Sequence, residues 1–333
     1  MSWNILVTAR TLEVAGQAAV ALLRDAGCHL SVPPRPGPLP LDELLARLPG
    51  ADAVFASMDP FTATVLASPA AATLKIISRW GVGYDAIDVP AATREGIVIA
   101  YTPGLLDDAV ADYAFALLLA LARRVHLGHL TMSQGAWTPT WGHDVAGKTL
   151  GILGCGRIGQ AVARRATGFN LRLLGCDVAP TPEAERGGIQ FVSLDELLAR
   201  SDFVSLHAAL TPQNRGLIGE TQLRRMKPSA YLVNTARGAL IDETALSRAL
   251  TEGWIAGAAL DAFATEPLSS DHPLRQAPNL LLTPHQASFA RDTGERVSLA
   301  AAQAIVDLMH GQRPRRVVNP EVFASPLLRA RLK

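Results

Sequence analysis

The chain has 333 residues, more than one ordinary domain of about 100–200 residues, which indicates two domains. Its 31 basic and 30 acidic side chains nearly cancel, which argues against the broad electropositive surface that binds nucleic acid or an anionic membrane. The three cysteines, Cys28, Cys155 and Cys176, have no CxxC spacing, which argues against a disulfide framework and a cysteine-based zinc site. We therefore expect no nucleic acid, membrane or metal as a partner.

Short strand-like runs alternate with helical stretches along the first hundred residues. Helical patterns cover 13–26 and 41–48, and the proline-rich stretch 33–38 predicts a stiff surface loop, because proline lacks a backbone donor. The start of the chain has no basic stretch followed by a long apolar core, so we expect a cytoplasmic protein and no signal peptide. The predicted strands of this region are Ile5–Thr8, Ala53–Ala56, Lys75–Ser78 and Ile97–Tyr101.

A second alternating set begins at Thr149, after an apolar stretch at 114–122. That stretch is far shorter than the roughly 20 residues that cross a bilayer, so it predicts a buried helix. A last helix over 292–310 would be free to return to the first domain, which makes that domain discontinuous. This alternation predicts an α/β protein with two doubly wound parallel sheets. The later predicted strands are 171–176, 203–206, 231–234, 256–260 and 280–283.

A glycine loop follows the strand that begins at Thr149. Gly154, Gly156 and Gly159 form a GxGxxG pattern, which allows a tight turn, approach of the backbone to a pyrophosphate, and close packing of helix on strand. Asp177 ends the next strand, about 20 residues on, where a carboxylate accepts from the hydroxyls of an adenosine ribose. Since no arginine follows Asp177 to pair with a 2′-phosphate, these residues predict NAD as the cofactor.

Polar candidates follow three later strands. Arg237, Glu266 and His285 each come after a strand end, where ligands of open α/β sheets bind. An arginine forms two parallel hydrogen bonds with a carboxylate, a histidine titrates near neutrality, and a glutamate beside it holds its charged form. His207, which also ends a strand, is interpreted as structural.

Taken together, these motifs resemble the D-isomer-specific 2-hydroxyacid dehydrogenases. The resemblance implies a flavodoxin-like substrate-binding domain made of residues 1–101 and 288–333. An inserted Rossmann NAD-binding domain would span 102–287, with the active site in the cleft. The resemblance covers roughly residues 50–320, and its motifs are the glycine loop, 81–88 (GVGYDAID), 234–242 (NTARGALID), 259–267 (ALDAFATEP) and 282–285 (LTPH).

The resemblance also implies roles for individual residues. It makes His285 the acid/base, Glu266 its partner and Arg237 the substrate clamp, while backbone amides around Val82 and Gly83 hold the substrate carboxylate. It further implies a homodimer formed through the cofactor domain and the segment 107–141. The implied cofactor contacts, besides the three glycines and Asp177, are Arg157 and Ile158 at the pyrophosphate, Asp261 at the nicotinamide carboxamide, and Ala208 and Thr235.

The predicted reaction is the NAD-dependent interconversion of a small 2-oxo acid, such as glyoxylate or hydroxypyruvate, and its D-2-hydroxy acid. D-3-phosphoglycerate is the alternative substrate, but the family's phosphoglycerate enzymes have arginines where this chain has Ala56 and the segment 138–140. Arg79 could meet a second anionic group, although we interpret it as structural. Formate dehydrogenases of the family have glutamine in place of Glu266. A corepressor-like protein gated by NAD(H) is the alternative of a different class.

Overall fold

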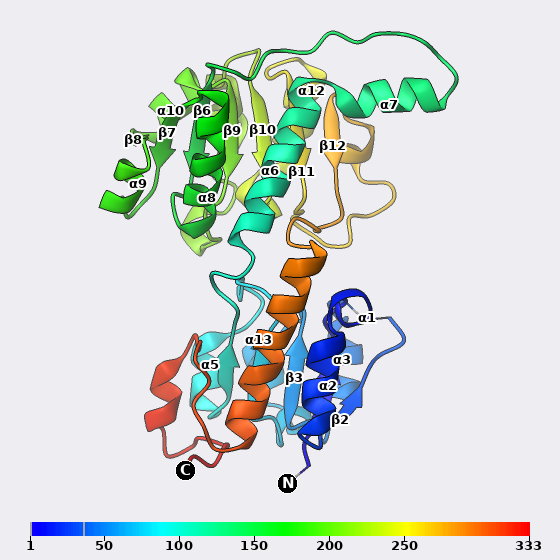
Figure 1. Cartoon of the computed structure of the whole chain (residues 1–333), viewed down its shortest axis with the longest axis vertical. Coiled ribbons are helices and arrows are strands. Elements are labelled where there is room, and N and C mark those ends of the chain that lie inside the picture. The colour runs from blue at the N-terminus through cyan, green and yellow to red at the C-terminus, as the bar shows by residue number, and fades with distance from the viewer. Residues whose placement is uncertain (1, 36) are drawn as a thin grey trace. The chain divides into compact units, whose positions relative to one another are not determined.

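The computed structural model describes residues 2–35 and 37–333, so Pro36 of the predicted proline-rich loop lies outside the described residues. Contacts divide the chain into two compact units, shown in Figure 1. The first unit ends at Leu106 and resumes at Phe289, and the second is Asp107–Ser288. Each unit has one parallel sheet between helices, which confirms the predicted α/β class. The domain boundaries after residues 101 and 287 remain predictions.

The first unit contains a five-stranded sheet in the order β2-β1-β3-β4-β5, which is the flavodoxin-like order. All of its strand pairs are parallel. The predictions missed β2, which lies at the sheet edge and buries none of its three residues. The strands are β1 (Asn4–Val7), β2 (His29–Ser31), β3 (Ala53–Ala56), β4 (Ile76–Arg79) and β5 (Val98–Ala100).

Helices cover both faces of this sheet. Alternate strand residues pack with α3, α4 and α5 in one core, and α13 packs on β4 from the other side, where Ser78 Oγ donates to Ala301 O at 2.7 Å. The helix predicted over 13–26 is two helices that meet at Gly16, whose φ of −141° and ψ of 10° lie outside the helical region. The helices are α1 (Leu12–Ala15), α2 (Gln17–Asp25), α3 (Leu41–Arg47), α4 (Ala63–Leu66), α5 (Val89–Arg94) and α13 (Arg291–Met309), with 3₁₀ turns η1 (Pro69–Ala71) and η6 (Pro320–Ala324).

The second unit contains a seven-stranded parallel sheet in the order β12-β11-β10-β9-β6-β7-β8. The chain runs outward from β6 on both sides, so the strand order reverses between β6 and β9, where open α/β sheets bind their ligands. The short edge strand β8 was not predicted. The strands are β6 (Thr149–Leu153), β7 (Arg172–Cys176), β8 (Ile189–Phe191), β9 (Phe203–Leu206), β10 (Tyr231–Asn234), β11 (Gly257–Leu260) and β12 (Leu280–Leu282).

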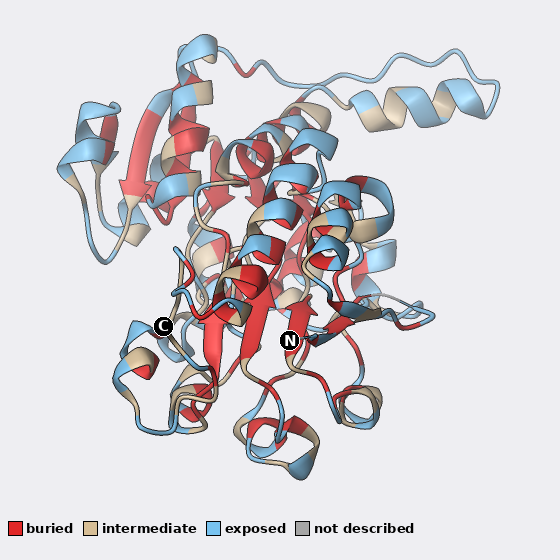
Figure 2. Ribbon diagram, turned by 60° about the horizontal axis from the view of Figure 1, so that its bottom comes forward, coloured by how far each residue is buried: buried red, intermediate tan, exposed pale blue. Residues whose placement is uncertain are grey.

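Two separate cores hold helices on the faces of the second sheet, and Figure 2 shows its central strands buried. One core contains α6 and α8, and the other contains α10, α11 and α12. The predicted apolar stretch 114–122 is the second half of α6. No helix in the described ranges is long and apolar enough to cross a membrane. The helices are α6 (Asp107–Ala122), α7 (Val125–Ser133), α8 (Arg157–Ala166), α9 (Pro182–Arg186), α10 (Leu194–Arg200), α11 (Glu220–Arg225) and α12 (Glu243–Thr251), with 3₁₀ turns η2 (Thr167–Phe169), η3 (Pro212–Asn214), η4 (Gly238–Leu240) and η5 (Pro273–Gln276).

Candidate active site

Three neighbouring strands of the second sheet end at the same edge. In the parallel register Asn234 of β10 pairs with Leu260 of β11, and Leu260 pairs with Leu282 of β12. Each strand continues into a loop that carries one predicted catalytic residue, and these are Arg237, Glu266 and His285 in the same order. The sheet topology therefore places residues that are 19 to 48 positions apart in adjacent loops.

The loops after β11 and β12 meet in a carboxylate–imidazole pair. Glu266 Oε2 lies 2.7 Å from His285 Nδ1, and the other oxygen, Oε1, accepts from the Phe263 N–H at 2.9 Å. Burial raises the pKa of Glu266, but the hydrogen bond and charge of His285, the Phe263 N–H and the charge of Arg237 outweigh it. The pKa of Glu266 is therefore held below its ordinary value, and its carboxylate is ionised at neutral pH. This pairing leaves Nε2 as the ring nitrogen that faces away from the carboxylate.

Asp261, at the end of β11, holds the turn that carries His285. Its Oδ1 accepts from the Thr283 hydroxyl at 2.7 Å and from the Gln286 N–H at 2.9 Å. Its Oδ2 accepts from the Ala287 N–H at 2.8 Å. His285 has a φ of +50°, which is uncommon for a residue other than glycine and is typical of functional sites.

Asp261 is only 1% exposed, so burial raises its pKa although these hydrogen bonds and the charge of His285 oppose the rise. Three of the roughly four acceptor positions of its carboxylate are used within the protein. The nicotinamide contact of Asp261 stays a prediction. The role of Asp261 in shaping the His285 turn was not predicted from the sequence, although the hydroxyl of Thr283 in the LTPH motif was a signal that could have indicated it.

The loop after β10 is shaped by a buried asparagine. Asn234 is fully buried, and its side chain donates to Arg237 O at 2.8 Å and accepts from the Ala236 N–H at 3.0 Å. Arg237 Nη1 donates to Ala236 O at 2.8 Å. A Cβ at Gly238 would lie 1.9 Å from the carbonyl carbon of Phe263, so only glycine allows the loops after β10 and β11 to touch through their backbones.

The glycine loop between β6 and α8 has the geometry of an anion site. Gly154 has a φ of +92°, and a Cβ there would lie 2.3 Å from the backbone nitrogen of Ala208. A Cβ at Gly156 would meet no atom within 4 Å, whereas one at Gly159 would lie 2.2 Å from Gly154 O. No side chain caps the N-terminus of α8, whose first residues are Arg157 and Ile158, so its N–H groups and dipole are available to an anion.

Asp177 lies beside this loop at the end of β7. Its Oδ2 accepts from the Cys155 N–H at 2.6 Å, and its Oδ1 accepts from the Ala179 N–H at 2.9 Å. Two buried polar atoms at the ends of β9 and β10, His207 Nδ1 and Thr235 Oγ1, have no hydrogen-bond partner among the residues described. An uncapped helix end, a carboxylate beside it and unpartnered polar groups at the same sheet edge fit a dinucleotide cofactor.

His207 agrees in part with its interpretation as a structural residue, because one of its two ring nitrogens has a hydrogen-bond partner within the protein. Its Nε2 lies 2.8 Å from Ser205 Oγ, and burial lowers the pKa of His207 to about 4, so the ring is neutral at physiological pH. Cys155, which lies within the glycine loop between Gly154 and Gly156, has its pKa raised to about 12 by burial and by the charges of Asp177 and Cys176. Neither group is suited to acid–base work near neutrality.

The predicted carboxylate contacts Val82 and Gly83 lie in the first unit, in the turn after β4. Arg79, at the end of β4, is 8% exposed, and its guanidinium donates to the carbonyls of Trp80 and of Gly83, the latter at 2.9 Å. Arg79 thus stabilises the backbone of this turn, as its structural interpretation predicted. In the ranges 2–35 and 37–333 no group of three or more His, Cys, Asp or Glu side chains could hold a metal ion.

Comparison with known proteins identifies the family of this chain. The sequence model described as "D-isomer specific 2-hydroxyacid dehydrogenase, NAD binding domain" matches residues 115–287. This chain belongs to the D-isomer-specific 2-hydroxyacid dehydrogenase family. It is therefore an NAD-dependent dehydrogenase that interconverts a 2-oxo acid and its D-2-hydroxy acid.

Relatives of this dehydrogenase align over most of their length. A glyoxylate reductase of Korarchaeum cryptofilum is 46% identical over 287 residues, which cover 84% of this chain and 86% of the relative. The crystal structure of the TT0316 protein from Thermus thermophilus matches with a TM-score of 0.85 and 41% identity, over 95% of this chain and 99% of that one. A glyoxylate reductase structure from Paecilomyes thermophila has a TM-score of 0.82 and 34% identity, over 96% and 99% of the two chains.

Proposed function

We propose that this dehydrogenase reduces a small, unphosphorylated 2-oxo acid such as glyoxylate or hydroxypyruvate. The observation that carries the proposal is the 2.7 Å pair of His285 and Glu266, with the charge of Arg237 acting on the same carboxylate. This arrangement combines a proton donor, a group that stabilises its charged form and a cation for a substrate carboxylate. The similarity to glyoxylate reductases supports the choice of a two- or three-carbon substrate.

In the reductive direction His285 transfers a proton to the carbonyl oxygen of the substrate. Its Nδ1 is held by Glu266, so Nε2 is the nitrogen that donates, and the ionised carboxylate stabilises the imidazolium that must be present beforehand. Arg237 binds the substrate carboxylate through two parallel hydrogen bonds, and the Val82 and Gly83 amides remain its other proposed contacts. NADH, when bound, supplies the hydride that reduces the carbonyl carbon.

The proposed cofactor contacts follow from the glycine loop. Gly154, Gly156 and Gly159 let the backbone approach the pyrophosphate, which the N–H groups of Arg157 and Ile158 would bind at the start of α8. Asp177 would accept from the ribose hydroxyls. The remaining proposed contacts are Ala208, Thr235 and Asp261.

A phosphorylated substrate is disfavoured by two residues of the first unit, Ala56 and Arg79. Ala56 is fully buried at the end of β3 and offers no cation, and the guanidinium of Arg79 donates to backbone carbonyls of its own turn. A phosphate would therefore lack the arginine pairing that its charge requires.

The decisive assay compares 2-oxo acids by kcat/KM for NADH oxidation. We expect glyoxylate or hydroxypyruvate to exceed phosphohydroxypyruvate, and a tenfold preference for phosphohydroxypyruvate would overturn the small-substrate proposal. His285→Ala is expected to lose about 10²- to 10⁴-fold in kcat while still binding NADH, because general acid catalysis contributes that much. Undiminished turnover by this variant would overturn the acid–base assignment.

We further propose that the protein is a homodimer and is cytoplasmic. No residue of α7 is buried, and Figure 2 shows that the segment following it is exposed as well. Exposed apolar side chains on this scale are typical of an interface. The exposed large apolar residues there are Val125, Leu130, Met132, Trp137 and Trp141.

Sedimentation at micromolar concentration tests the dimer. A monomeric wild type would overturn it, and the double variant Leu130→Glu with Met132→Glu is expected to be monomeric. The free thiols Cys28, Cys155 and Cys176 support the cytoplasmic setting, where thiols stay reduced.

A further inference from the structure

The loop that carries Glu266 is held by a second carboxylate outside the catalytic pair. Glu243, the first residue of α12, accepts the Ala264 N–H through its Oε1 at 2.7 Å. The preceding N–H, that of Phe263, donates to Glu266 at 2.9 Å. Two consecutive peptide N–H groups are thus bound by two different carboxylates, one of which continues to His285.

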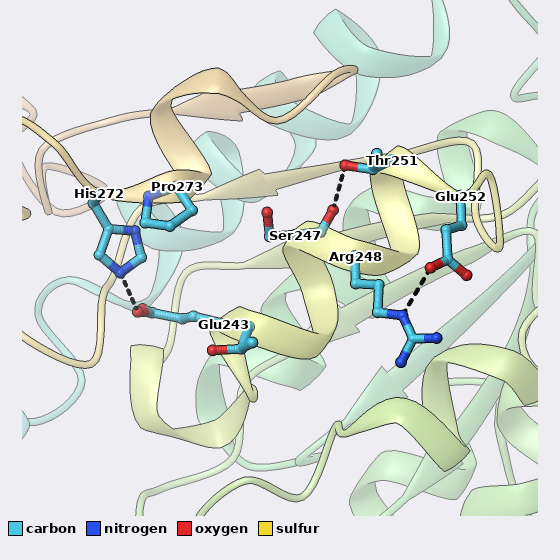
Figure 3. A pocket seen from close by; sticks show the side chains of 8 residues that line it. Glu243, Ser247, Arg248, Thr251, Glu252, His272 and Pro273 are labelled. Atoms are coloured by element: carbon cyan, nitrogen blue, oxygen red, sulfur yellow. Dashed lines mark hydrogen bonds and ion pairs between the residues drawn. The ribbon is translucent and has the colours of Figure 1, made fainter.

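Glu243 is itself held in place. Its side chain is only 13% exposed, and its second oxygen, Oε2, lies 3.4 Å from His272 Nε2. His272 Nδ1 accepts from the Leu274 N–H at 3.3 Å, so Nε2 is the ring nitrogen that donates to Glu243. Figure 3 shows this contact at one end of a pocket of about 300 Å³ on α12.

The other charges in this pocket do not compete for Glu243. Arg248 Nε lies 2.7 Å from Glu252 at the far end of the helix, as Figure 3 shows, and Arg248 Nη1 lies 3.2 Å from Glu220. Glu243 therefore acts on the loop after β11 and on His272. Glu252, at the opposite end of α12, contacts Arg248, Trp254 and Arg224.

The loop needs such an anchor. Ala264, Thr265 and Pro267 are exposed, so little apolar burial holds this stretch in position. A hydrogen bond from an N–H to an ionised carboxylate is among the strong ones. If it were lost, the Phe263–Ala264 peptide could shift, and the Glu266 carboxylate would shift with it relative to His285.

We propose that Glu243 is a positioning residue of this dehydrogenase: by binding the Ala264 N–H, it keeps the Glu266 carboxylate in contact with His285. The inference rests on the proposed acid–base role of His285. A merely structural role is the competing explanation, since an acidic side chain in the first turn also stabilises a helix through its dipole.

Two substitutions separate these roles. Glu243→Gln loses the charge that favours the helix N-terminus but keeps an oxygen that reaches the Ala264 N–H. Glu243→Asp keeps the charge but withdraws the carboxylate by about 1.5 Å, the length of one carbon–carbon bond. Glu252→Gln is the matched control, because it neutralises a carboxylate of the same pocket that does not contact the loop.

The measurements are kcat and KM for glyoxylate, NADH affinity by fluorescence and the pH profile of reductive kcat. If Glu243 positions Glu266, Glu243→Asp lowers kcat by about tenfold or more, because small displacements at a reacting centre are costly. Its NADH affinity stays unchanged, and the alkaline limb of its profile moves to lower pH, since a displaced carboxylate stabilises the imidazolium less. Glu243→Gln and Glu252→Gln retain kcat within threefold of the wild type.

The opposite pattern overturns the inference. A fully active Glu243→Asp would show that the reach of this side chain to the Ala264 N–H does not matter. A Glu243→Gln as impaired as Glu243→Asp would show that an oxygen within reach of that N–H is not enough to position Glu266. Failure of the proposed function is distinguishable, because it appears in His285→Ala: turnover by that variant removes the acid–base assignment whatever the Glu243 variants do.

Discussion

Gly238→Ala is the substitution that most directly tests how the catalytic loops are held together. A Cβ at this position would lie 1.9 Å from the carbonyl carbon of Phe263, 2.2 Å from its Cα and 2.3 Å from the nitrogen of Ala264. All three atoms are backbone, so no flexible side chain can move aside. Because Gly238 is not in the left-handed region, the expected effect is steric and involves no backbone strain.

The magnitude follows from ordinary contact distances. Carbon atoms pack at about 3.5–4.0 Å, so the two loops must separate by roughly 1.5–2 Å. A shift of that size exceeds the range of the 2.7 Å bond between Glu266 and His285, since hydrogen bonds extend to only about 3.2 Å. Overpacking costs about 1–3 kcal/mol, and a displacement of about 1 Å at a reacting centre costs about 10²-fold in rate.

Two assays measure these effects separately. Thermal unfolding is expected to show a Tm lower by between about 2 and 12 °C, from about 2–4 °C per kcal/mol for a domain of this size. Steady-state NADH oxidation is expected to show a kcat lower by about 10²-fold. Gly168→Ala is the control, because a Cβ there meets no atom within 4 Å and its φ is ordinary. A Gly238→Ala enzyme with wild-type kcat and Tm would refute the claim that contact of these loops positions Glu266.

Glu266 is expected to stay ionised well into the acid range, because its pKa lies below the ordinary value of 4.5. Reductive kcat should therefore show no reversible acid-side loss between pH 7 and pH 5. The free energy of unfolding that this pairing contributes should be lost only as the pH falls through the lowered pKa of Glu266. A reversible loss of kcat with a midpoint between pH 5 and 6 would contradict the pairing with His285. Wild-type enzyme should prefer NAD over NADP by at least about tenfold in kcat/KM, and Asp177→Ala should lose that preference; equal use of both cofactors by the wild type would mean that Asp177 does not meet the ribose. Burial raises the pKa of the Cys155 thiol to about 12, so mass spectrometry should find this cysteine unmodified after iodoacetamide treatment at pH 8. Faster labelling of Cys155 than of the less buried Cys176 would be inconsistent with this burial.

Much of the fold was predictable from short stretches of sequence. The apolar runs of β3, β6, β9 and β10 are fully buried in the structure, as their composition predicted. β2 and β8 were missed because each has three residues at a sheet edge and buries at most one of them, which leaves no continuous apolar run to detect. The break at Gly16 was missed because it is a change in the backbone angles of one residue, and the apolar pattern continues across it.

The residues of the candidate site also differ in whether short stretches of sequence could predict them. The glycine loop and the candidate residues Arg237, Glu266 and His285 could be named from short motifs, because glycine spacing and residue chemistry act over a few positions. The contact of Glu266 with His285 and the hydrogen bond from the Ala264 N–H to Glu243 could be found only in the folded chain. These contacts join loops and a helix 19 to 21 residues apart, and they exist because β11 lies between β10 and β12 in the sheet. Strand order is a property of the whole packed sheet, and no single segment of the chain contains it.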